Sequence, residues 1–82
     1  MSRASTAELG RLRWRCRRGM KELDLLLSGW LDRHQDSAGA PELAAFARLL
    51  EQQDPLLMAW VAGRGLPDDP AVAAIICDIT GR

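Results

Sequence analysis

The chain has 82 residues, and a domain of this size has little room for a deep pocket shielded from water, which argues against an enzyme and favours a binding module. Its formal net charge is zero, which argues against a nucleic-acid-binding domain. The charge is nevertheless uneven: residues 1–33 hold eight Lys and Arg against four Asp and Glu, whereas residues 34–82 hold three against seven. Such asymmetry can orient a partner protein during encounter.

The first expected helix runs from Thr6 to Arg18. Ser5 and Glu8 have the spacing of a capping box, in which the two side chains bond free backbone N–H groups at a helix start. Apolar residues then recur at the spacing of one helix face, at Leu9, Leu12 and Cys16.

The second expected helix runs from Met20 to Arg33 and has the clearest amphipathic pattern in the chain. Its apolar residues recur at i, i+3, i+4, i+7 and i+8, at Leu23, Leu26, Leu27, Trp30 and Leu31. His34 follows near the end of this helix and is expected to face solvent.

Prolines mark the starts of the remaining helices. Pro41 suits the first position of a third helix that ends near Gln52. Asp54 and Asp69 each precede a proline, as an N-cap residue often does, and predict a fourth and a fifth helix. Glycines follow the expected ends of these two helices, at Gly63, Gly65 and Gly81.

These patterns predict an all-α fold, a compact five-helix domain that spans residues 1–82. No alternation typical of a strand is present in the sequence. The expected core comprises Leu9, Leu12, Cys16, Leu23, Leu26, Leu27, Trp30, Phe46, Leu50, Leu57, Trp60, Ile75, Ile76 and Ile79.

Charged residues crowd the junction between the first two expected helices. Gly19 suits a position just past a helix end, where the backbone is left-handed. Arg17 and Arg18 would occupy the last turn of the first helix and Glu22 the first turn of the second, where each charge suits the helix dipole. The charges therefore favour a break at Gly19 over one continuous helix. Surface ion pairs stabilise a fold by only about 0–1 kcal/mol each, so we interpret the surplus charge as a recognition surface.

The segment from Trp14 to Asp24 resembles the hallmark of the FAD assembly factors of succinate dehydrogenase, which bacterial members share with the mitochondrial factor. It reads Trp-Arg-Cys-Arg-Arg-Gly-Met-Lys-Glu-Leu-Asp. The Arg-Gly-x-x-Glu motif of that family falls on Arg18, Gly19 and Glu22. A second block also resembles the family, at Leu49-Leu50-Glu51, Asp54-Pro55 and Trp60.

The resemblance implies a small five-helix protein that binds the flavoprotein subunit of succinate dehydrogenase, and often that of fumarate reductase. It implies promotion of covalent FAD attachment to a histidine of that client, with no catalytic residue and no cofactor of its own. Arg18 and Glu22 would make polar contacts with the client, and Gly19 would allow close approach. Arg17, Met20 and Asp24 would flank this protein-binding patch. We expect the free protein to be a monomer.

Two other functions compete with this interpretation. An antitoxin-like or other regulatory role would also require a protein partner, so the sequence does not separate it from the assembly role. Nucleic-acid binding would use the arginines of the first helix, but the second helix carries few base-reading side chains. Among the aromatic residues, Trp30 and Trp60 are expected in the core, whereas Trp14 lies off the apolar face and is expected near the motif.

The cysteines indicate the cellular compartment. Cys16 and Cys77 are the only two, and no apolar signal segment precedes them, so we expect free thiols in a reducing cytosol.

No apolar run approaches the roughly 20 residues that span a bilayer, so no membrane insertion is expected. The abundance of Ala, Arg, Leu and Gly with a single Lys is typical of a GC-rich bacterial genome. The two cysteines and His34 lack the spacing of zinc ligands.

Overall fold

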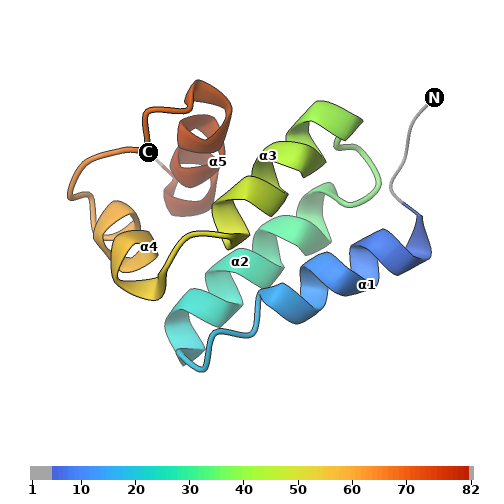
Figure 1. Cartoon of the computed structure of the whole chain (residues 1–82), viewed down its shortest axis with the longest axis horizontal. Helices are drawn as coiled ribbons and strands as arrows, with labels where there is room; N and C mark the ends of the chain where they lie inside the picture. The colour runs from blue at the N-terminus through green and yellow to red at the C-terminus, as the bar shows by residue number, and fades with distance from the viewer. Residues whose placement is uncertain (1–4, 82) are drawn as a thin grey trace.

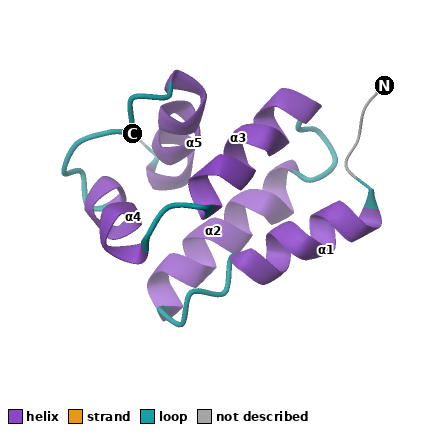
Figure 2. Cartoon of the chain, in the orientation of Figure 1, coloured by secondary structure: helices purple, strands orange, loops and turns teal. Residues whose placement is uncertain are grey.

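The computed structural model describes residues 5–81, so residues 1–4 and 82 of the expected domain lie outside the described part. All regular structure in this part is helical: α1 spans Thr6–Arg15, α2 Lys21–His34, α3 Ala40–Leu50, α4 Asp54–Val61 and α5 Pro70–Thr80 (Figure 2). The Cα radius of gyration is 11.8 Å, close to the roughly 12 Å of a compact chain of this length. The all-α, five-helix prediction is confirmed. None of the described helices is both long and apolar enough to cross a membrane.

The helices pack around a core to which α2, α3 and α5 contribute most. α3 contacts both α1 and α5, and α5 also packs against α2 and α4 (Figure 1). An ion pair between Arg13 and Asp32 joins α1 to α2, with Nη1 and Oδ1 2.5 Å apart. The chain reverses between α1 and α2 and again between α2 and α3, so the α1–α2 and α3–α4 connections lie at the same end of these helices (Figure 1).

The helix starts follow the caps that the sequence predicts. Ser5 accepts a hydrogen bond from the Glu8 N–H, and the Glu8 carboxylate accepts one from the Ser5 N–H, so the capping box is confirmed. Asp69 caps α5 by accepting from the N–H groups of Ala71 and Val72. The fourth helix differs by one position, because Gln53 is its N-cap and Asp54 its first helical residue. Asp54 is therefore available for another contact.

The predicted end of the first helix is wrong. α1 ends at Arg15, and Arg17 and Arg18 lie in the connection that follows rather than in a last helical turn. The physical reason is tertiary, because the Arg18 side chain bonds groups of α3 and α4. The other boundaries shift by two residues or fewer from those expected.

Most of the expected core is confirmed, but three leucines were misjudged. The buried residues among those expected are Cys16, Leu23, Leu27, Trp30, Phe46, Leu50, Leu57, Trp60, Ile75, Ile76 and Ile79. Leu9, Leu12 and Leu26 are only partly buried against this core. For Leu9 and Leu12 the reason is that α1 lies on the outside, with no fully buried residue of its own.

Trp30 lies at the centre of the core and joins several helices. Its ring stacks on Phe46 and on His34, with centroids 4.6 Å apart in both pairs. Its indole N–H donates to Asp78 Oδ2 of α5 at 3.0 Å. The same oxygen lies 2.7 Å from His34 Nε2. The prediction that His34 faces solvent is therefore wrong, because the ring is partly buried between Trp30 and Asp78.

Candidate functional site

The candidate site is built on the connection between α1 and α2, residues 16–20, which we call the motif turn. Gly19 has φ +83°, a left-handed backbone that glycine adopts without steric cost, so the predicted break at Gly19 is confirmed. A Cβ atom built on Gly19 would meet no heavy atom within 4 Å. Backbone conformation, rather than internal crowding, therefore explains the glycine within this chain.

Cys16 fixes the start of the motif turn in the core. It is the C-cap residue of α1, and its side chain is almost fully buried. Burial raises the pKa of its thiol to about 11, although Arg13 and Arg18 favour the thiolate. Because the pKa is raised in the fold, the protonated thiol favours folding, and this contribution is lost as the pH rises from about 9 through 11.

The two thiols should differ sharply in reactivity. Cys77 is only partly buried, whereas Cys16 is buried and protonated at neutral pH, so a maleimide at pH 7–8 is expected to label Cys77 first. Cys16 should react only when the protein is denatured. Mass spectrometry of labelled peptides with and without denaturant would measure this. Equal labelling of both cysteines in the native protein would contradict the burial of Cys16.

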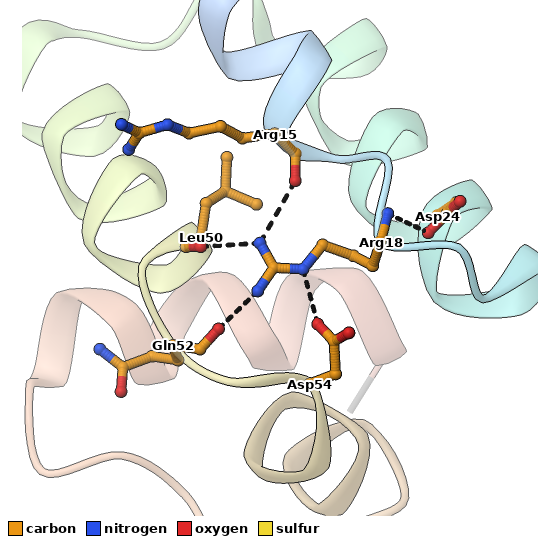
Figure 3. Close-up of polar contacts among 6 residues, drawn as sticks. All are labelled: Arg15, Arg18, Asp24, Leu50, Gln52 and Asp54. Carbon is orange, nitrogen blue, oxygen red and sulfur yellow. Dashed lines mark hydrogen bonds and ion pairs between the residues drawn. The ribbon is translucent and has the colours of Figure 1, made fainter.

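Arg18 extends from the motif turn to the α3–α4 connection and makes four side-chain hydrogen bonds (Figure 3). Nε donates to Asp54 Oδ1 at 2.7 Å, and Nη2 donates to the Gln52 carbonyl at 2.5 Å. Nη1 donates to the Leu50 carbonyl at 2.7 Å and to the Arg15 carbonyl at 3.3 Å. Leu50 and Arg15 are the last residues of α3 and α1, so the guanidinium lies where two helix dipoles place partial negative charge.

Asp24 holds the other side of the motif turn. Its Oδ1 accepts the backbone N–H of Arg18 at 2.8 Å (Figure 3). The backbone N–H of Asp24 in turn donates to the Met20 carbonyl, as expected for the first turn of α2. Arg18 and Asp24, both expected at the binding patch, thus have contacts within the chain that order the turn. The Arg18 side chain is only 15% exposed.

The other residues expected at the patch are exposed. Arg17, Gly19 and Glu22 lie on the surface, and Met20 is 36% exposed. The Glu22 carboxylate forms no hydrogen bond or ion pair with any residue between 5 and 81. Trp14 is 68% exposed, and the Arg17 guanidinium carbon lies 5.5 Å from the centroid of its ring. The motif turn and the adjoining ends of α1 and α2 therefore present a cation, an anion and apolar side chains on a backbone that Arg18 and Asp24 order from within.

The sequence did not indicate the full extent of this site. Asp54 was interpreted as a helix cap, and the carbonyls of Leu50 and Gln52 leave no sequence signal. Trp14 was expected near the motif but not assigned to the patch, and its exposure supports that location. Within residues 5–81 no group of three or more His, Cys, Asp or Glu side chains is placed to hold a metal ion. The exposed side chains of the site can offer charge and apolar contact to a partner.

Comparison with known proteins gives a consistent result. Residues 10–82 match the model of the family described as the flavinator of succinate dehydrogenase. Similar curated proteins are named FAD assembly factor SdhE. That of Shewanella oneidensis is 39% identical over 74 residues, which cover 90% of each chain. That of Methylococcus capsulatus is 44% identical over 69 residues, covering 84% of this chain and 83% of the relative. No solved structure gives a significant match.

Proposed function

The chain belongs to the family of succinate dehydrogenase flavinators, and from that premise we propose that it binds the flavoprotein subunit of succinate dehydrogenase through the motif turn. The observation that carries the proposal is the exposed turn itself, which sits at the family's Arg-Gly-x-x-Glu segment on a rigid internal support. The outcome of binding is the covalent attachment of FAD to the client. The flavoprotein subunit of fumarate reductase is a second client, to which FAD is attached in the same way.

We assign different tasks to the six residues of the patch. Arg17, Gly19, Met20 and Glu22 contact the client, because their surfaces are open to solvent. Trp14 joins them, since its ring lies next to Arg17. Arg18 and Asp24 support the turn from within, and this revises the expectation that Arg18 makes polar contacts with the client.

The proposed mechanism requires no catalytic group on this chain. By binding one conformation of the client more tightly, the protein increases the population of that conformation. In it, the acceptor histidine of the client is held near the flavin methyl group, and orientation alone can lower the barrier to bond formation. The rigid turn suits this task, because a surface that is ordered before binding loses less conformational entropy on binding.

The same proposal includes several further properties. The protein acts as an assembly factor in the bacterial cytoplasm rather than as an enzyme, and carries no cofactor of its own. It is a monomer when free, and it uses neither nucleic acid nor membrane insertion.

Replacement of Glu22 with alanine tests the contact surface. Loss of an interface contact worth about 1 kcal/mol weakens binding about fivefold, so we expect covalent flavin on the client to fall by up to about that factor when the client concentration is below its Kd. In-gel flavin fluorescence of the co-expressed flavoprotein subunit measures this, and circular dichroism should show unchanged helix content.

Asp36→Ala is the matched control. It removes the same charge from an exposed position beyond the other end of α2, roughly 20 Å away along the helix. Flavinylation should be unaffected by this control. Normal flavinylation by a folded Glu22→Ala protein would remove Glu22 from the interface, and no dependence of covalent flavin on the wild-type chain would refute the assembly function.

A further inference from the structure

We propose that Asp54 is a positioning residue for client binding, acting through Arg18 to fix the conformation of the motif turn. This inference rests on the proposed function of that turn. Asp54 belongs to α4 and is separated from Arg18 by 36 residues in sequence, yet its Oδ1 lies 2.7 Å from Arg18 Nε (Figure 3). It would affect the client without touching it.

Within residues 5–81, Asp54 is the only charged acceptor among the side-chain contacts of Arg18. The other three acceptors are the carbonyls of Arg15, Leu50 and Gln52, which carry only partial charge. The pair is partly shielded from water, with side-chain exposures of 15% for Arg18 and 36% for Asp54, so its attraction is less screened than that of a surface pair. Asp54 therefore supplies most of the directional attraction that draws the arginine toward the α3–α4 connection.

The geometry explains how this contact reaches the client surface. A planar guanidinium held on one edge by Asp54 and on its other nitrogens by carbonyls has little freedom to rotate. The backbone N–H of Arg18 is bound by the Asp24 carboxylate at the same time. The residue immediately after Arg18 is Gly19, whose left-handed backbone directs Met20 and α2. Release of the side chain would thus loosen the segment that we assign to the client.

Asp54 could instead act only as a first-turn residue of α4, where a carboxylate favours the helix dipole. The chain contains a matched control for this possibility. Asp69 also precedes a proline in the first turn of a helix, and it pairs with Arg48 through Nε and Oδ2 at 2.8 Å. Asp69 therefore repeats the chemistry of Asp54, and it caps α5 as well, but its arginine lies outside the motif turn.

The test measures binding of the purified flavoprotein subunit, lacking covalent FAD, to the full-length variants by titration calorimetry. We expect Asp54→Ala to weaken binding about tenfold or more, and Asp69→Ala to leave it within about twofold while lowering the melting temperature. Amide exchange of residues 17–20 should accelerate in Asp54→Ala and stay unchanged in Asp69→Ala. In an Arg18→Ala background, Asp54→Ala should have little further effect on binding, because the two residues act as one unit.

Three results would overturn the inference. They are wild-type binding by Asp54→Ala, equal weakening by Asp69→Ala, and a full additional loss when Asp54→Ala is added to Arg18→Ala, which would mean that Asp54 acts independently of Arg18. The Glu22→Ala variant separates this inference from the proposed function. If Glu22→Ala weakens binding and Asp54→Ala does not, only the positioning role fails, whereas loss of both effects refutes the interface itself.

Discussion

Trp30→Ala is expected to cause a large loss of stability. The mutation removes the stacking of the indole on Phe46 and its hydrogen bond to Asp78, and it leaves a cavity at the junction of α2, α3 and α5. Truncation of a buried tryptophan costs about 3–5 kcal/mol, a large part of the roughly 5–15 kcal/mol that stabilises a small domain. The melting temperature should therefore fall by about 12 °C or more.

Two control variants identify the origin of the loss. Trp30→Phe retains an aromatic ring against Phe46 but not the donor to Asp78, so its cost should be a fraction of that of Trp30→Ala. Trp14→Ala removes an equally large side chain that is 68% exposed, and it should change stability by less than about 1 kcal/mol. Thermal unfolding followed by circular dichroism measures all three. Similar losses for Trp14→Ala and Trp30→Ala would contradict the buried position of Trp30.

Local signals predicted the helix starts well, because the groups that start a helix are close in sequence. Ser5 and Glu8 are three residues apart, and Asp69 caps N–H groups only two and three residues ahead of it. Local signals also predicted most of the core, because the period of apolar residues in α2 depends only on that helix. The fold class could therefore be predicted from sequence alone.

The failures at Arg18 and His34 share one physical cause, which is contact between residues far apart in the chain. Arg18 was expected in a helical turn, but its partners Leu50, Gln52 and Asp54 lie 32 to 36 residues away. His34 was expected in solvent, but it packs on Trp30 and pairs with Asp78, 44 positions further on. Periodicity carries no information about such pairs, so the support of the candidate site could only be found in three dimensions.

The internal contacts of Arg18 also explain why the Arg-Gly-x-x-Glu motif, which has three fixed positions, depends on residues outside its own segment. Gly19 provides the left-handed backbone, and Glu22 lies exposed in the first turn of α2. Arg18 links both to the ends of α1 and α3. The arginine is thus a structural element within the segment that we propose for client recognition, and its substitution should affect stability and client binding together.

Arg18→Lys separates charge from geometry in this linkage. Lysine keeps the positive charge near Asp54, but its compact ammonium has three donors and cannot reproduce a planar fork that reaches Asp54 and the carbonyls of Leu50 and Gln52 at once. We expect Arg18→Ala to cost about 2–3 kcal/mol of stability and most of the client flavinylation. Arg18→Lys should restore part of the stability but little of the flavinylation, because the motif turn would still be loosely held.

Chemical denaturation together with in-gel flavin fluorescence of the co-expressed client measures both effects. Full flavinylation with Arg18→Lys would show that charge alone is sufficient and that the planar geometry is dispensable. Full flavinylation with a folded Arg18→Ala protein would show that the client orders the motif turn on binding. In that case the internal hydrogen bonds of Arg18 would serve only the stability of the free protein, and the exposed residues of the turn would determine recognition by themselves.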